Sequence, residues 1–181
     1  MATTTSTSDK RVLTGLFRDR DSAERAYQSI TDRGYGRDDV NLVMSDETRQ
    51  RHFSGTTADG RQTELGTKAA EGAGIGGAIG GSLGAIAAAI AAVGTTIALP
   101  GLGLVIAGPL AAAIAGAGAG AATGGIVGAL IGWGIPEERV KEYDQGIRDG
   151  GILMAVRPRS DEDATWLEDS WKANRGEHVY R

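Results

Sequence analysis

Residues 72–136 have the sequence GAGIGGAIGGSLGAIAAAIAAVGTTIALPGLGLVIAGPLAAAIAGAGAGAATGGIVGALIGWGIP. This stretch contains 19 Gly and 19 Ala, and it has no Asp, Glu, Lys, Arg or His. All 23 acidic and 19 basic residues of the 181-residue chain therefore lie outside it. A run of about 20 apolar residues is enough to cross a bilayer. The length without charge therefore predicts a membrane-embedded segment between two charged flanks.

The centre of this stretch carries a turn signal, Pro100-Gly101, with Gly103 just after it. We take Pro100, Gly101 and Gly103 as the turn of a hairpin between two helices, one over 70–97 and one over 105–134. Each helix has more than the roughly 20 residues needed to cross about 30 Å of hydrocarbon. The prediction is a transmembrane helical hairpin with an uncharged turn on the far side of the membrane.

Glycines recur at every fourth position in both predicted helices. This spacing places them in one flat stripe along a helix, beside a bulky stripe of Ile, Leu and Val. Flat and bulky faces let helix backbones approach closely, which holds helices together in lipid as a glycine zipper. The expected helix-packing residues are Gly72, Gly76, Gly80, Gly84, Gly116, Gly120, Gly124, Gly128 and Gly132.

Two other interpretations of the stretch stay open. Gly costs about 1 kcal/mol in a water-exposed helix, so these helices need lipid or burial, and a soluble oligomer with the hairpins in its core would also provide it. A disordered linker is disfavoured by the Ile/Leu stripe. Residues 72–77 satisfy G-x-G-x-x-G, but no strand precedes them and no acid follows until Glu137. We therefore expect no nucleotide cofactor.

The charged flanks repeat one pattern of strand, capped helix and strand. A capping box, Asp21-Ser22-Ala23-Glu24, begins the first helix, and Ser160 caps the second. Each half alone has too little core to be stable. We therefore expect the halves to pair as one α+β domain of the ferredoxin-like (split βαβ) class, interrupted by the Gly/Ala-rich transmembrane hairpin. The expected strands cover residues 11–18, 40–44, 151–157 and 177–181.

The predicted organisation has six segments, which are listed here in chain order. They are a disordered N-terminus (1–10), a first βαβ half (11–45), a polar linker (46–69), the glycine-zipper hairpin (70–135), a connecting helix (136–150) and a second βα(β) half (151–181). Basic residues stand only at the outer ends of the hairpin, so the positive-inside rule places both termini in the cytoplasm.

Several stretches resemble bacterial general stress proteins of the heat-induced stress protein type. The resemblance covers about residues 11–158 and implies a stress-linked role at the bacterial inner membrane, with no established activity and no catalytic residues. It rests on Val12–Arg18 with the helix start Asp21–Glu24, on Leu99-Pro100-Gly101-Leu102-Gly103 with Ala107–Leu110, and on Gly134-Ile135-Pro136-Glu137-Glu138 through Tyr143 to Gly150–Leu153.

The sequence shows no active site, because its two histidines, His52 and His178, lie in segments expected to be mobile, whereas a catalytic base must be held rigidly. A net charge of -4 disfavours nucleic-acid binding, and the lack of cysteine excludes thiol catalysis and disulfides. We expect no catalytic, cofactor-binding or metal-binding residues and no cofactor. The arginines that end equivalent strands could form a basic patch for an anionic group, although solvated strand ends are the preferred interpretation. They are Arg18, Arg20, Arg157 and Arg159.

Two classes of function follow. In the first, the chain is a non-enzymatic, membrane-embedded protein associated with stress, which self-assembles into homo-oligomers through its glycine helices and its cytoplasmic domain. In the second, it is a ligand- or partner-sensing module that gates a small membrane pore. The stretch offers only a few hydroxyls and no charge, which favours the first class because conduction paths usually carry strongly polar groups.

Overall fold

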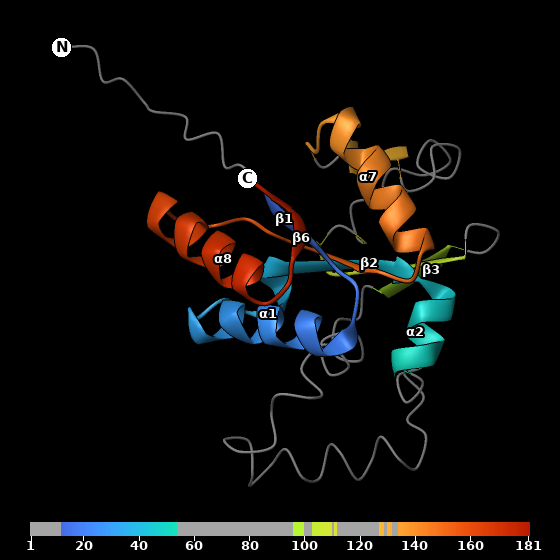
Figure 1. Cartoon of the computed structure of the whole chain (residues 1–181), viewed down its shortest axis with the longest axis horizontal. Coiled ribbons are helices and arrows are strands. Elements are labelled where there is room, and N and C mark those ends of the chain that lie inside the picture. The colour runs from blue at the N-terminus through green and yellow to red at the C-terminus, as the bar shows by residue number, and fades with distance from the viewer. Residues whose placement is uncertain are drawn as a thin grey trace, which may run out of the picture.

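The computed structural model describes residues 12–53, 96–99, 103–109, 111, 127, 128, 130, 131 and 134–181. These residues form an α+β fold with helices on both faces of one antiparallel sheet (Figure 1). The elements in chain order are β1 (Leu13–Phe17), α1 (Arg20–Asp32), the 3-10 helix η1 (Arg37–Asp39), β2 (Val40–Ser45), α2 (Asp46–Phe53), β3 (Thr96–Leu99), β4 (Leu104–Ala107), α7 (Glu137–Arg148), β5 (Ile152–Val156), α8 (Asp161–Ala173) and β6 (Glu177–Tyr180).

The sheet has six strands in the order β3-β4-β2-β5-β1-β6, and every neighbouring pair is antiparallel. Strand β5 lies between the two strands of the first flank, so that Val156 is opposite Leu13 on one side and Val40 on the other. The two charged flanks of the sequence therefore build one sheet rather than two. Each strand of one flank has a hydrogen-bonded neighbour from the other flank, and β2 also pairs with β4.

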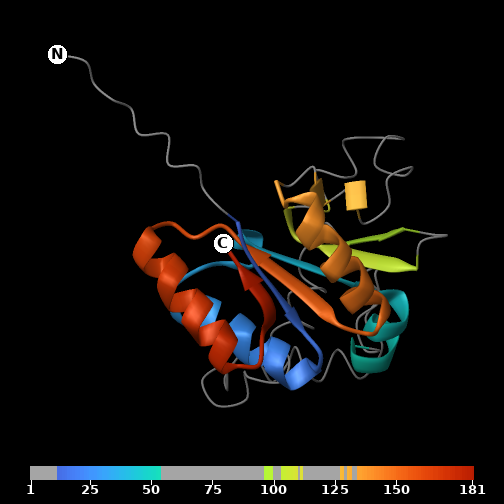
Figure 2. The ribbon, with the colours of Figure 1, turned by 45° about the horizontal axis from the view of Figure 1, so that its top comes forward.

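Alternate residues of the strands fill two separate cores. In β1, Leu13 and Phe17 face the core under α1 and α8, where Phe17 packs edge-to-face on Trp171 with ring centroids 5.7 Å apart. Leu16 faces the opposite core, which α7 covers with Val140 and other apolar side chains. Figure 2 shows α7 crossing the sheet on the side away from α1 and α8. Burial on both faces explains why the central strand β5, Ile152–Val156, is apolar at every position.

Side-chain caps mark the starts of helices α1 and α8. The Ser160 hydroxyl accepts a hydrogen bond from the Asp163 amide and caps α8, as predicted. The predicted capping box at Asp21 is wrong, because the cap of α1 is Asp19, whose carboxylate accepts from the Ser22 amide at 2.8 Å. The carboxylate of Glu24, the expected second half of the box, lies buried.

The boundary of the predicted polar linker differs from the structure. The polar linker expected over 46–69 is helical in its first part, because α2 occupies Asp46–Phe53. Its last residue, Phe53, is buried in the core under α1, and the Arg20 guanidinium donates to the His52 carbonyl at 2.8 Å. These tertiary contacts hold a polar sequence in a helix that its own apolar pattern does not predict. Residues 54–69 lie outside the described part of the chain.

The helices predicted over 70–97 and 105–134 are wrong at their facing ends. Residues Thr96–Leu99 and Leu104–Ala107 are the strands β3 and β4, which pair with each other, and β4 pairs with β2. A short apolar run does not distinguish a buried strand from a buried helix by periodicity. The rest of the first predicted helix, 70–95, lies outside the described residues.

Because β3 and β4 both belong to the sheet, Leu99 and Leu104 on either side of the predicted turn lie in the domain. These residues cannot lie across a membrane from the domain, as the predicted helical hairpin required. Within the described residues, no helix is both long enough and apolar enough to cross a bilayer.

Candidate functional site between helix α7 and the sheet

The described parts of the uncharged stretch meet the domain under α7. Leu104 and Ile106 of β4, Ala111, Leu130 and Ile135 are all buried in this core. Helix α7 adds the apolar face that the sequence predicts for a connecting helix, with Val140, Tyr143 and Ile147 turned inward. The core under α7 therefore joins the charged domain to the Gly/Ala-rich stretch, and Val105 and Ala107 of β4 also enter the core on the other face.

Tyr143 is the polar centre of this core. Its side chain is buried, yet its hydroxyl donates to the His178 carbonyl and shares a hydrogen bond with the Thr14 hydroxyl, each at 2.7 Å. Burial raises the pKa of Tyr143 above its usual value, and the hydrogen bond from Thr14 opposes that rise. The raised pKa favours the protonated phenol, whose two hydrogen bonds tie α7 to β1 and β6.

A cluster of polar side chains from α7 and β6 continues from Tyr143 to the surface. The His178 Nδ1 atom lies 3.0 Å from a Glu142 carboxylate oxygen, and the Tyr180 hydroxyl lies 3.4 Å from the same oxygen. The Arg139 guanidinium stacks over the Tyr180 ring at 4.4 Å. His178 has a positive φ of 49°, a backbone conformation that costs energy for a residue other than glycine. These side chains fasten the last strand to α7.

A second polar network joins the two halves on the other face of the sheet, beside α1 and α8. The Tyr35 hydroxyl donates to the Asp163 carboxylate at 2.7 Å and accepts from the Arg159 amide at 2.8 Å. The Arg159 guanidinium stacks on the Tyr35 ring at 4.1 Å and pairs with Asp39 at 2.9 Å. Burial raises the pKa of Tyr35, so this phenol is also protonated. The network links the end of α1 to the start of α8.

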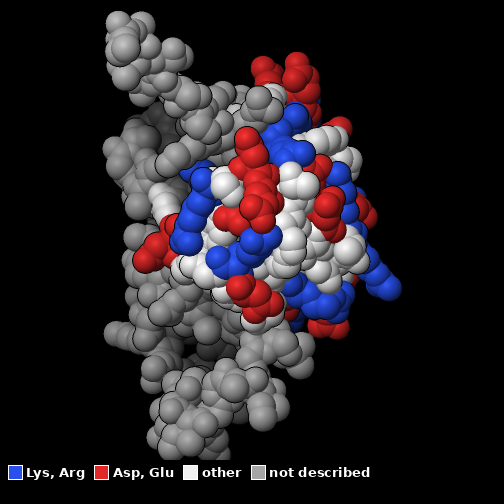
Figure 3. All heavy atoms as spheres, turned by 90° about the vertical axis from the view of Figure 1, so that its left-hand side faces the viewer, with Lys and Arg blue, Asp and Glu red and all other residues white. Residues whose placement is uncertain are grey.

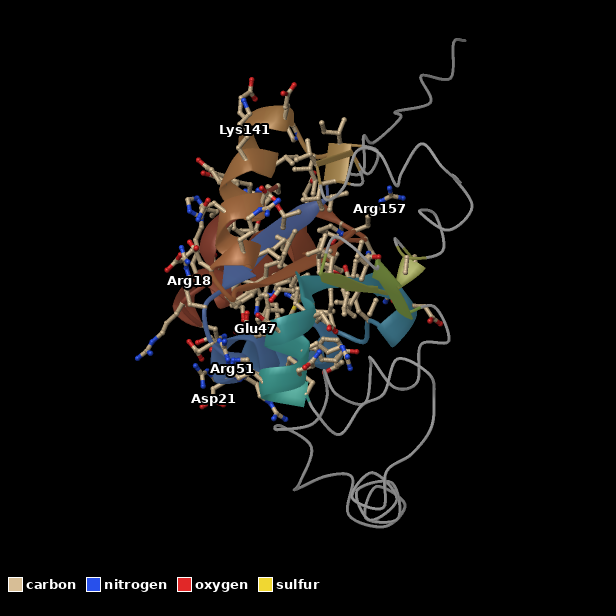
Figure 4. All side chains as sticks on the ribbon, turned by 90° about the vertical axis from the view of Figure 1, so that its right-hand side faces the viewer. Arg18, Asp21, Glu47, Arg51, Lys141 and Arg157 are labelled. Atoms are coloured by element: carbon tan, nitrogen blue, oxygen red, sulfur yellow. The ribbon has the colours of Figure 1, made fainter. Side chains whose placement is uncertain are left out.

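The alternative in which the four arginines form one basic patch does not agree with their positions. Strands β1 and β5 are antiparallel, so the residues that follow them, Arg18 and Arg157, lie at opposite ends of the sheet (Figure 4). Arg18 pairs with Glu177 at 2.7 Å, Arg20 lies 3.6 Å from Glu24, and Arg159 binds Asp39. Figure 3 shows acidic and basic side chains interleaved on the face of the molecule that it views. These arginines stabilise the fold locally and do not gather for an anion.

The structure describes few of the residues predicted to pack helices or form the turn. Gly128 lies in a helical turn and is exposed, and a Cβ added there would meet no atom within 4 Å. Gly103 precedes β4 at a φ of +63°, which suits a turn. The remaining predicted residues lie outside the described part of the chain: Gly72, Gly76, Gly80, Gly84, Gly116, Gly120, Gly124, Gly132, Pro100 and Gly101.

The residues that the sequence analysis missed are hydroxyl-bearing side chains in apolar positions. The sequence placed Tyr143 only within the predicted connecting helix, 136–150, and Thr14 only within the predicted strand, 11–18. The sequence signal for such a pair is a hydroxyl group at a position predicted to face the core, because a buried hydroxyl needs a hydrogen-bond partner. In the described segments, no group of three or more His, Asp or Glu side chains could hold a metal ion.

Comparison of the chain with protein-family models, curated proteins and solved structures found no match. Functional conclusions therefore rest on the sequence and on the geometry of the described residues.

Proposed function

We propose that this chain is a non-enzymatic, membrane-associated protein that self-assembles, in which a ferredoxin-like domain holds Gly/Ala-rich segments against a bilayer. The observation that carries the proposal is the run of residues 72–136 without a single charge, attached to a domain rich in charge. Such a segment is costly in water and stable in lipid or in a protein core. A domain tethered to it would be held at the membrane surface.

The ferredoxin-like part of the proposal rests on the order of four strands. Two strands of the first flank, β1 and β2, and two of the second, β5 and β6, follow the order β2-β5-β1-β6. Helices α1 and α8, one from each half, cover the same face and contact each other. This is the arrangement expected of two interlocked βαβ halves. The β3–β4 hairpin and α7 are additions to it.

The position of β3 and β4 changes how the uncharged run can enter a membrane. Residues 72–95 lie between α2 and β3, two elements of the same domain. A single crossing of the membrane by this segment would therefore place α2 and β3 on opposite sides of the bilayer. Two passes through so short a segment give about 12 residues each way, or about 18 Å of helix. This is less than the roughly 30 Å of hydrocarbon. We therefore propose shallow, re-entrant insertion from one side of the membrane.

Re-entrant segments favour self-assembly. Backbone that is not continuous helix is tolerated at membrane depth only where protein surrounds it. Neighbouring copies of the Gly/Ala-rich segments would provide that surrounding, and glycine stripes allow close packing. Val127 and Ile131, one helical turn apart, are 36% and 43% exposed, whereas the neighbouring Leu130 is buried. The exposed pair offers an apolar surface to lipid or to another copy.

The location proposed is the bacterial inner membrane, with the domain and both chain ends on the cytoplasmic side. The pairing of β1 with β6 supports one side for both ends, because these strands come from opposite ends of the chain. Basic residues at the outer ends of the uncharged run support the cytoplasmic side. The stress-linked role follows from the resemblance to general stress proteins alone.

The test is fractionation followed by an alkaline carbonate wash. The proposal predicts that the full-length chain sediments with membranes and stays there after the wash, and that detergent releases it as an oligomer. Recovery as a soluble oligomer without detergent would favour the alternative, an assembly that buries the Gly/Ala-rich segments in its own core. A soluble monomer would contradict both.

The sensing and gating alternative predicts ion flux through vesicles that contain the protein. Vesicles that remain tight to ions while the protein is carbonate-resistant would support the structural role.

A further inference from the structure

The two edges of the sheet differ in how they are protected against pairing with another strand. Edge strand β6 carries Glu177, which pairs with Arg18, and His178, whose φ is positive. Its register against β1 shifts between Thr14 and Leu16, which marks a bulge or irregularity. Charges, irregular backbone and short length are the devices by which proteins prevent edge-to-edge association. The β6 edge has all three.

The β3 edge has short length but neither of the other devices. Its sequence is Thr96-Ile97-Ala98-Leu99, and the flanking chain contains no charge from 72 to 136. Its pairing with β4 runs in continuous register from Thr96 opposite Ala107 to Leu99 opposite Leu104. In the described sheet, β4 is its neighbour on one side and no strand lies on the other. Figure 1 shows β3 at the margin of the sheet, away from β6.

We propose that β3 is an interaction surface for a second copy of this chain, and that two β3 strands pair antiparallel across a two-fold axis. The two sheets would then continue into one. Symmetric pairing of this kind uses the same strand on both partners, so one segment supplies both halves of the interface. A different protein partner would require side chains that select it, and charged groups usually provide that selectivity. The β3 segment offers only backbone and small or apolar residues.

This inference rests on the proposed self-assembly and gives it a specific contact. The chain contains no cysteine, so a single introduced cysteine can form a disulfide only with another copy. The experiment is a cysteine scan of the full-length chain in mild detergent, with Thr96→Cys, Ile97→Cys, Ala98→Cys and Leu99→Cys oxidised separately. Glu177→Cys, at the exposed β6 edge, is the matched control.

The two-fold axis predicts that the rate of crosslinking depends strongly on the position of the cysteine. A residue on the axis faces its own copy at about 5 Å between Cβ atoms, within reach of a disulfide after small adjustments. Each step along the strand separates a residue from its own copy by about 6.8 Å more, because both strands advance about 3.4 Å in opposite directions. One position should therefore crosslink at least tenfold faster than those two residues away, and Glu177→Cys should not crosslink above background.

Other outcomes overturn the inference in distinguishable ways. Equal crosslinking at all four positions would mean parallel, in-register pairing, and crosslinking as fast at Glu177→Cys would mean random collision. An oligomer by size with no crosslink in the scan would reject the β3 interface while leaving self-assembly intact, whereas a monomer would reject both. Ile97→Lys, which places a charge on the edge, should weaken association at least tenfold. Unchanged association in that variant would also contradict the inference.

Discussion

Replacing Gly108 by alanine tests whether the centre of the uncharged stretch is sheet or helix. Gly108 follows β4 directly and has a φ of +104°, which disfavours any residue with a side chain. A Cβ there would overlap the carbonyl oxygen of Val40 and would lie 3.0 Å from the Asn41 Cα atom. Both atoms belong to the backbone of β2, so they cannot move aside as a flexible side chain would.

The expected loss in the free energy of unfolding has two contributions. An unfavourable backbone conformation costs on the order of 1–3 kcal/mol, and overpacking costs a further amount of about 1–3 kcal/mol. We expect Gly108→Ala to lower the free energy of unfolding by about 3 kcal/mol, a large share of a typical total of about 5–15 kcal/mol. Urea unfolding followed by tryptophan fluorescence measures it, because Trp171 is fully buried in the domain.

Gly128→Ala is the matched control, because the sequence assigned both glycines to the same helix. Gly128 is helical and exposed with open space around it, so alanine should stabilise by up to about 1 kcal/mol through helix propensity. The two variants should thus shift stability in opposite directions. A Gly108→Ala variant as stable as the wild type, or more stable, would refute the placement of β4 in the sheet.

Three further outcomes are expected. Tyr143→Phe should cost about 1–2 kcal/mol in urea unfolding through its two lost hydrogen bonds. Tyr180→Phe should cost less than about 0.5 kcal/mol, because the Tyr180 hydroxyl makes a long, exposed hydrogen bond to Glu142 at 3.4 Å. Because burial raises the pKa of Tyr143, the contribution of Tyr143 should be present below about pH 10 and fade above it. Burial opposes ionisation of Asp19, but the Ser22 hydrogen bonds outweigh it and lower its pKa. Asp19→Ala should therefore cost about 1 kcal/mol at pH 7, and the difference from wild type should shrink below about pH 3.9. Replacing Gly80 and Gly124 together by Leu should reduce self-association in detergent by about tenfold or more if the glycine stripes face another copy. If the stripes face helices of the same chain, the double variant should instead be less stable. An unchanged oligomer size and stability would refute the packing role of these glycines.

Local sequence features determined the strands and helices of the two flanks. The apolar runs of β1, β2 and β5, the inward positions of α1, α7 and α8, and the Ser160 cap are all encoded within a few residues of where they act. Short-range patterns of this kind depend on the backbone period, which is the same in every protein. The pairing of the flanks was also expected, because neither half has enough apolar surface to be stable alone.

Tertiary contacts decided the features that the local pattern leaves ambiguous. Residues 104–107 are apolar at every position, so either a buried helix or a doubly buried strand satisfies them, and the free edge of β2 selected the strand. The polar α2 segment is helical where Phe53 anchors it to the core.

The sequence by itself therefore determined a charged α+β domain and an uncharged Gly/Ala-rich stretch within it. Only the tertiary structure decided that the middle of that stretch belongs to the sheet, and that Arg18 and Arg157, equivalent in the sequence repeat, lie at opposite ends. The physical reason is that hydrogen-bond partners in a sheet are chosen across long distances in the chain. Composition and periodicity report which surfaces must be buried, but not which strand buries them.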